Sequence, residues 1–153
     1  NENSIKKNAI FKSKFIHNIY KSNVFSDDTG LEIEALNNEP GVRSARYSGE
    51  EKNPLKNIEL VLKKLEGISN RKARFRTVIS LIYNDKNYCF EGIVNGTIID
   101  KPKGNMGFGY DPIFVANNMK KTFAEISLEE KNKISHRAIA TNKLIDFLLK
   151  KVF

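Results

Sequence analysis

Hydrophobic residues recur at helical spacing in three segments of the chain, residues 4–21, 54–67 and 135–149. Apolar side chains at every third or fourth position would give each segment one buried face. Asn53 and Ser135 stand where the side chain of an N-cap residue accepts a backbone hydrogen bond. We therefore predict three amphipathic helices that pack on the rest of the protein through their apolar faces.

Between the second and third of these segments, the hydrophobic spacing shortens to the alternation that is typical of strands. Residues 73–83 and 88–94 both alternate, and the polar residues 84–87 between them predict the turn of a β-hairpin. The dipeptide Asn95-Gly96 predicts a further turn into residues 97–99. The middle of the chain is therefore predicted to form an antiparallel or mixed sheet.

The composition is that of a globular protein of one domain. The chain has 153 residues, of which 40% are hydrophobic and 29% are charged. The single cysteine, Cys89, excludes an internal disulfide and suits a reducing interior. The sequence contains no apolar stretch long enough to span a bilayer and opens with no signal-peptide pattern. We expect a cytoplasmic protein without a membrane partner.

The formal net charge of +8 raises the question of nucleic-acid binding. The lysines, however, are scattered over many segments instead of forming one basic stripe. A small anionic substrate would be attracted by the same field. We therefore expect a small-molecule substrate and no nucleic-acid partner.

Two adjacent carboxylates, Asp27 and Asp28, follow the apolar residues Val24 and Phe25. We expect the pair to lie at the carboxyl end of a buried strand, where Gly30 allows the chain to turn. Carboxylates in such a place can hold a cation such as Mg²⁺, or position and deprotonate a water. The alternative is an Asx-type turn, in which both carboxylates only accept backbone hydrogen bonds.

A glycine-rich stretch, residues 101–112, is the second candidate site. It contains three glycines, and Phe108, Tyr110 and Asp111 stand among or next to them. Glycines let the backbone approach a ligand, the two aromatic rings could stack on a planar group, and the aspartate could accept hydrogen bonds from it. An ordinary long loop is the alternative.

Basic residues are concentrated just before and at the start of the last predicted helix. Lys131 lies in a short helix that precedes it, and His136 and Arg137 lie in its first turn, directly after Ser135. A basic pair at a helix N-terminus opposes the helix dipole, but it fits a phosphate or an electron-rich base edge bound there. The alternative is that His136 is an ordinary surface or core histidine.

Four motifs follow one another along the chain, at residues 26–36, 40–50, 107–114 and 129–137. They resemble the successive motifs of the inosine triphosphate pyrophosphatase family, whose members are also called dITP/XTP or noncanonical purine NTP pyrophosphatases. The resemblance extends from about Ile5 to the C-terminus. Because four motifs occur in the family's order, the resemblance is specific.

The resemblance implies a Mg²⁺-dependent hydrolase that cleaves dITP, ITP or XTP to the monophosphate and pyrophosphate and so cleanses the nucleotide pool. Asp28 would be the catalytic proton acceptor and a metal ligand, and Lys12 would reach the phosphates. The 6-oxo edge of the purine would be favoured, because a base that leaves donors and acceptors unmatched is penalised. The residues that match the family's substrate contacts are Thr29, Phe108, Gly109, Tyr110, Asp111, Lys131, His136 and Arg137.

The resemblance also implies an α/β fold with a mixed, elongated central sheet, helices packed around it, and a substrate cleft between two lobes. The family forms homodimers, so we expect one here. We expect residues 1–153 to form a single domain of this family that is truncated at its N-terminus, because the family's first strand and triphosphate-binding loop do not precede Asn1. In addition, Lys7 stands where the family usually has an acidic residue.

Two other functions compete with the enzyme. A nucleotide-binding remnant without catalysis would fit the missing triphosphate loop. A basic nucleic-acid-binding domain would require tight, strongly salt-dependent binding to DNA or RNA, and net charge alone supports it.

Overall fold

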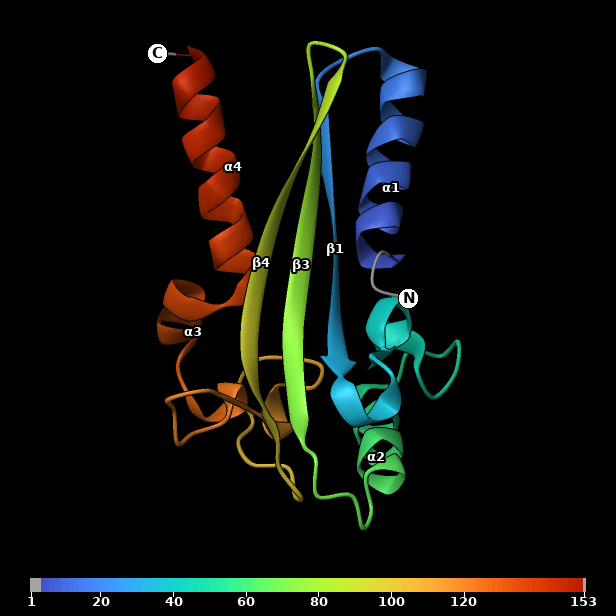
Figure 1. Ribbon diagram of the computed structural model, residues 1–153, viewed down its shortest axis with the longest axis vertical. Coiled ribbons are helices and arrows are strands. Elements are labelled where there is room, and N and C mark those ends of the chain that lie inside the picture. Colours follow the sequence, from blue (N-terminus) through green and yellow to red (C-terminus); the bar gives the residue numbers. More distant parts are fainter. Residues whose placement is uncertain (1–3, 153) are drawn as a thin grey trace.

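A five-stranded sheet in the order β2-β1-β3-β4-β5 forms the centre of the computed structural model, which describes residues 4–152. Its strands are β1 (Val24–Ile33), β2 (Glu39–Pro40), β3 (Lys72–Tyr83), β4 (Lys86–Ile98) and β5 (Phe114–Ala116). β3 and β4 form one long hairpin, whose tip residues Asn84 and Asp85 adopt the left-handed conformation. This hairpin gives the molecule its elongated shape (Figure 1).

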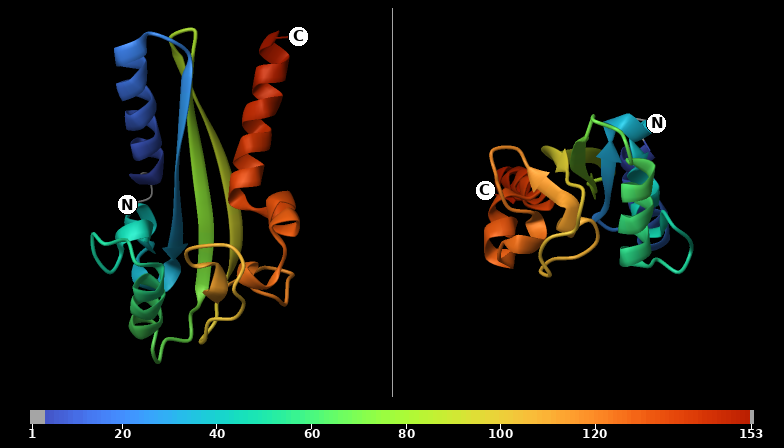
Figure 2. Two further views of the ribbon diagram at one scale, coloured as in Figure 1. Left: turned by 180° about the vertical axis from the view of Figure 1, so that it is seen from behind. Right: turned by 90° about the horizontal axis from the view of Figure 1, so that it is seen from below.

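Two long helices cover opposite faces of the sheet. α1 (Ser4–Tyr20) packs on β1 and β3, and α4 (His136–Val152) packs on β3 and β4. Figure 2 shows the sheet standing between these two helices. The shorter helices α2 (Pro54–Lys64) and α3 (Leu128–Ile134) lie towards the end of the sheet where β1 finishes (Figure 1). None of the helices within residues 4–152 is long and apolar enough to cross a lipid bilayer.

The structure confirms the α/β class and the predicted helices. Asn53 caps α2 by accepting a hydrogen bond from the backbone N–H of Lys56 at 3.1 Å, and Ser135 caps α4 by accepting one from Ala138 at 3.1 Å. The sheet that we expected to be mixed is antiparallel at each pairing within the described residues. The reason lies in the connection through α2, which returns the chain to the end of the sheet where β1 finished, so β3 runs back along it.

The turn predicted at Asn95-Gly96 is wrong, because β4 continues through both residues to Ile98. Asn95 and Gly96 pair with Arg74 and Ala73 of β3, which extends far enough to keep the ladder going. The glycine is explained by crowding instead of a turn. A Cβ atom at position 96 would lie 2.6 Å from the ring of Phe114 and 2.4 Å from the carbonyl oxygen of Val115.

The turn predicted after Asp27 and Asp28 is wrong as well. Both residues lie inside β1, in register with Ile79 and Val78, and Gly30 continues the strand opposite Arg76. Gly30 is required by close approach, since a Cβ there would lie 2.4 Å from the carbonyl oxygen of Gly41. The two carboxylates therefore have strand geometry, in which neighbouring side chains point to opposite faces of the sheet.

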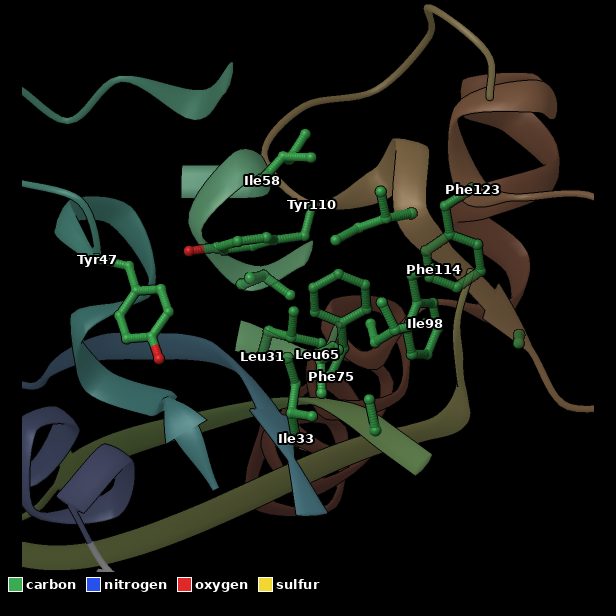
Figure 3. Close-up of a cluster of buried hydrophobic side chains, with 14 of the residues drawn as sticks. Leu31, Ile33, Tyr47, Ile58, Leu65, Phe75, Ile98, Tyr110, Phe114 and Phe123 are labelled. Atoms are coloured by element: carbon green, nitrogen blue, oxygen red, sulfur yellow. The ribbon is translucent and has the colours of Figure 1, made fainter. Parts of the chain in front are cut away.

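The larger hydrophobic core lies at the end of the sheet nearest α2. The ring of Phe75 packs against Phe114 and Phe123, with centroid distances of 4.5 and 5.9 Å. Figure 3 shows Phe75 between Leu31 on one side and Phe114 and Phe123 on the other, with Tyr110 near Ile58 of α2. A smaller apolar cluster of Ile79, Leu81, Ala140 and Leu144 holds α4 against β3.

Candidate active site

A cavity of about 340 Å³ lies beside the second half of β1. It is bounded by β1, the start of α2, the loop before residue 111, α3 and the first turn of α4. Its lining includes all eight residues that the sequence predicts to contact substrate, namely Thr29, Phe108, Gly109, Tyr110, Asp111, Lys131, His136 and Arg137. These residues are up to 108 positions apart in the chain, so the fold has brought the predicted contacts to one place.

A buried ion pair organises the glycine-rich loop on one side of the cavity. Asp111 Oδ2 accepts hydrogen bonds from Lys131 Nζ at 2.5 Å and from the backbone N–H of Phe108 at 3.0 Å. The Lys131 ammonium also lies 4.2 Å from the centroid of the Phe108 ring, within cation–π range. Gly107 has a φ of +73°, and a Cβ there would lie 2.2 Å from Asp111 Oδ2. The glycine therefore lets this carboxylate close the loop.

Phe108 is the exposed member of this group, with 71% of its surface accessible. Tyr110 is buried, and its hydroxyl donates a 2.6 Å hydrogen bond to the carbonyl oxygen of Ser44. Burial raises the pKa of the Tyr110 hydroxyl, so it stays protonated and keeps donating. Tyr110 thus forms part of the cavity wall, whereas the Phe108 ring is free to meet a planar ligand.

His136 is buried in the first turn of α4, where its ring stacks on Phe75 with a centroid distance of 4.8 Å and an angle of 14° between the planes. Burial, together with the nearby Lys131 and Arg137 charges, lowers the pKa of the imidazole to about 3. The basic pair predicted at this helix start therefore carries only one charge at neutral pH. Nδ1 of His136 is buried without a hydrogen-bond partner within the described residues, so it remains available to a ligand.

Arg137 provides the charge of that pair and reaches back to β1. Its Nη1 donates a 2.5 Å hydrogen bond to Asp27 Oδ2, and its Nη2 donates one of 3.1 Å to Thr29 Oγ1. Thr29 Oγ1 also lies 2.8 Å from Thr77 Oγ1 on the neighbouring strand. One guanidinium group thus spans two side chains on the same face of β1.

Asp28, the predicted proton acceptor, lies on the other face of β1, which α1 covers. Lys12 of α1 places its ammonium 3.6 Å from Asp28 Oδ1 and donates a 2.7 Å hydrogen bond to the carbonyl oxygen of Asp27. Burial raises the pKa of Asp28, and Lys12 and Asn8 partly counteract the rise. Asp28 Oδ2 is buried without a hydrogen-bond partner within residues 4–152. Such an oxygen can accept a proton or bind a cation.

Sequence reasoning assigned α2 to packing and did not predict the part it plays in the cavity wall. Asn57 of this helix is buried, accepts hydrogen bonds from the backbone N–H and hydroxyl of Ser48, and donates one of 2.9 Å to the carbonyl oxygen of Ala45. A polar residue within an amphipathic helix would have been the only signal. The lining residues that the sequence analysis did not name as ligand contacts are Gly30, Leu31, Ser44, Ala45, Lys52, Pro54, Asn57 and Phe75.

The fold and the cavity together define a class of protein. It is an α/β protein with a cavity that an exposed aromatic ring and basic side chains line, and such a cavity suits a small, planar and negatively charged ligand. The chain belongs to the Ham1 family, whose model matches residues 1–147.

The comparisons with individual proteins agree with this assignment. A dITP/XTP pyrophosphatase of Flavobacterium psychrophilum is 51% identical over 145 residues, which are 95% of this chain and 76% of that protein. A dITP/XTP pyrophosphatase of Thermoanaerobacter pseudethanolicus is 46% identical over 98% of this chain and 77% of its own length. The chain thus spans about three quarters of the length of these relatives.

Solved structures show the same fold. The Ham1 protein of Staphylococcus aureus has a TM-score of 0.94 and 45% sequence identity, covering 96% of this chain and 77% of that one. A HAM1 protein of Coxiella burnetii has a TM-score of 0.91 and 39% identity over 94% of this chain and 76% of its own. The resemblance that the four motifs indicated is confirmed.

Proposed function

We propose that this chain is a nucleoside-triphosphate pyrophosphatase that hydrolyses noncanonical purine nucleotides, dITP, ITP and XTP, to the monophosphate and pyrophosphate. One structural observation carries the proposal. A cavity whose lining includes the predicted base contacts lies beside β1, and Asp28, which precedes the lining residue Thr29 on that strand, is a partly buried carboxylate with one unpartnered oxygen among residues 4–152. The names of the relatives support the same reaction.

The base enters the cavity and stacks on Phe108, which is exposed and backed by the Lys131 ammonium. His136 is neutral at physiological pH, so its ring can exchange a hydrogen bond with the base without placing a charge against it. A 6-oxo purine satisfies the polar groups of the wall. The 6-amino group of adenine presents hydrogen-bond donors where a 6-oxo purine presents an acceptor. Buried polar groups of the site would then be left without a partner, which disfavours binding of adenine nucleotides.

Hydrolysis takes place at the α-phosphorus. The oxygen of a water molecule forms a bond to this phosphorus while the bond to the bridging α–β oxygen breaks, and pyrophosphate leaves with the bonding electron pair. Asp28 accepts the proton of the attacking water, and its raised pKa makes it a stronger base than an exposed aspartate. Lys12, 3.6 Å from Asp28, contacts the phosphates and stabilises the developing negative charge.

The residues around Asp28 fit Mg²⁺ bound together with substrate. Residues 4–152 contain no group of three His, Cys, Asp or Glu side chains that could hold a metal by themselves. Mg²⁺ is commonly held by one or two carboxylates plus substrate phosphates and water, and Asp28 offers an unpartnered carboxylate oxygen for this role. When bound there, the ion would offset negative charge on the triphosphate.

We further propose that the chain acts as one domain and forms a homodimer in the cytoplasm, cleansing the nucleotide pool, with a small-molecule substrate and no nucleic-acid partner. The scattered lysines, which form no single basic stripe in the sequence, support the last point. We propose that the cavity is the substrate cleft.

The test is pyrophosphate release from dITP and XTP, compared with ATP and GTP, in Mg²⁺ and in EDTA. We expect metal-dependent release confined to dITP and XTP. Asp28→Asn should lower kcat by about 10²- to 10⁴-fold. Its melting temperature should not fall, because burial already disfavours the charged form of this side chain.

Asp146→Asn, which removes an exposed carboxylate of α4 outside the cavity lining, is the matched control and should keep the wild-type rate. Unchanged turnover in Asp28→Asn would overturn the assignment of the base. Binding of dITP without release from any nucleotide would favour the non-catalytic remnant instead.

A further inference from the structure

The two adjacent carboxylates of β1 are divided between the two faces of the sheet. Asp28 pairs in register with Val78, which packs against Ile5 and Ala9 of α1. Asp27 pairs in register with Ile79, which packs against α4. Because neighbouring side chains of a strand point in opposite directions, the two carboxylates cannot converge on one cation or one water.

Asp27 instead holds a residue of the cavity wall. Its Oδ2 accepts the 2.5 Å hydrogen bond from Arg137 Nη1, and the other arm of the same guanidinium reaches Thr29 Oγ1 at 3.1 Å. Asp27 and Thr29 are two residues apart on β1 and therefore lie on the same face. The rigid fork of an arginine matches this spacing, whereas a lysine would make only one of the two contacts.

Stability alone does not explain this ion pair. The side chain of Arg137 is 53% exposed and that of Asp27 is 37% exposed, and ion pairs at such positions contribute little to folding. The pair does fix an otherwise flexible side chain, and Arg137 lines the cavity. An arginine already held in one conformation loses less rotamer freedom when a ligand binds.

We propose that Asp27 is a positioning residue, which holds the Arg137 guanidinium beside Thr29 in the orientation that meets the nucleotide; the inference rests on the proposed function. The adjacent aspartates then have separate tasks. Asp28 works on the water and the phosphates, and Asp27 acts only through Arg137. This division predicts that losing Asp27 weakens substrate binding more than it slows the chemical step.

The test is a double-mutant cycle with dITP, using Asp27→Asn, Arg137→Ala and the double variant. We expect Asp27→Asn to raise KM about tenfold and to change kcat little. In the Arg137→Ala background the same substitution should have no further effect, because the group through which Asp27 acts is gone. Asp27→Glu, which restores a carboxylate, should recover most of the affinity. Asp85→Asn, which removes an exposed carboxylate 3.1 Å from His17 Nε2, is the control and should behave as wild type.

If the fold increases in KM of the two single variants multiply in the double variant, Asp27 acts independently of Arg137 and the proposal is overturned. An unchanged KM in Asp27→Asn would overturn it as well. The orientation itself can be measured without turnover, through the guanidinium nitrogen NMR signals of Arg137, assigned with Arg137→Lys. We expect these signals to broaden or shift towards those of a free arginine in Asp27→Asn and to stay unchanged in Asp85→Asn. If the wild-type protein releases no pyrophosphate, the proposed function fails. Unchanged Arg137 NMR signals in Asp27→Asn would reject the positioning role of Asp27, whether or not the protein is active.

Discussion

The contact between β4 and the first turn of α4 depends on the absence of a side chain at Gly92. A Cβ atom added there would lie 1.9 Å from the carbonyl oxygen of His136 and 2.8 Å from the backbone nitrogen of Ala140. Both are helix backbone atoms, so a change of side-chain rotamer cannot relieve the clash. In Gly92→Ala, the start of α4 must therefore move away from the sheet by roughly an ångström or more.

Such a shift would disturb both stability and the candidate site. Overpacking of this kind costs about 1–3 kcal/mol, which corresponds to a melting temperature lower by about 3–10 °C for a chain of this size. Arg137 follows His136 directly, so its hydrogen bonds of 2.5 and 3.1 Å to β1 would be lost or stretched. We expect kcat/KM for dITP to fall by about tenfold to a hundredfold, as misplacement on this scale does in other active sites.

The assay combines thermal unfolding, followed by circular dichroism, with pyrophosphate release. Thr97→Ala, an exposed position on the same strand, is the control and should leave both measurements close to wild type. If Gly92→Ala melts and turns over like the wild-type protein, the direct contact of α4 with β4 does not hold the site, and the reasoning fails.

Two further predictions concern His136 and Lys52. The pKa of the His136 imidazole is lowered to about 3 in the folded protein. Below pH 6.5 the unfolded chain therefore binds a proton at this residue, whereas the folded chain does not. As the pH falls from 6.5 to 5, this difference should lower the free energy of unfolding by about 1.5 kcal/mol. Denaturant unfolding at both pH values should show this loss of stability in the wild type but not in His136→Phe, which keeps an aromatic ring on Phe75. Equal losses of stability in both proteins would contradict the prediction. Lys52 lines the cavity and forms no ion pair within residues 4–152. The base of XTP loses a proton near neutral pH, whereas that of dITP does not. Lys52→Gln should therefore lower the XTP-to-dITP ratio of kcat/KM by about two- to fivefold. Lys63→Gln, which changes an exposed lysine of α2 outside the cavity lining, should leave the ratio unchanged. A wild-type ratio in Lys52→Gln would show that Lys52 takes no part in base recognition.

Local signals in the sequence were sufficient to predict the helices and the long hairpin. Asn53 and Ser135 cap their helices with the hydrogen bonds that their side chains favour, and the polar residues 84–87 mark the hairpin turn. Part of the cavity lining was also predictable, because residues such as Phe108 and Arg137 belong to motifs whose order along the chain resembles that of a known family. The roles of these residues in catalysis and binding stay predictions.

The glycines were misread because the reason for each lies far away in the chain. Gly30 and Gly96 look like turn residues, yet both continue a strand and make room for the backbone of a distant segment, at Gly41 and Val115 respectively. Local propensity cannot distinguish a glycine that bends the chain from one that admits a neighbour. The contribution of Asn57 to the cavity wall was missed for the same reason, since its partners Ser48 and Ala45 precede the helix.

The register of β1 links the fold to the proposed chemistry. Each step along a strand changes the face on which a side chain lies, so a slip of one residue would exchange Asp27 with Asp28. The slip is opposed because Leu31 and Ile33, which share a face of β1 with Asp27, are fully buried in the larger core and would be moved to the opposite face. Burial of these two side chains therefore also assigns one carboxylate to the Lys12 side and the other to the Arg137 side. The division of labour between the two aspartates follows from hydrophobic packing, and a substitution that loosens either helix should disturb only the chemistry on its own face.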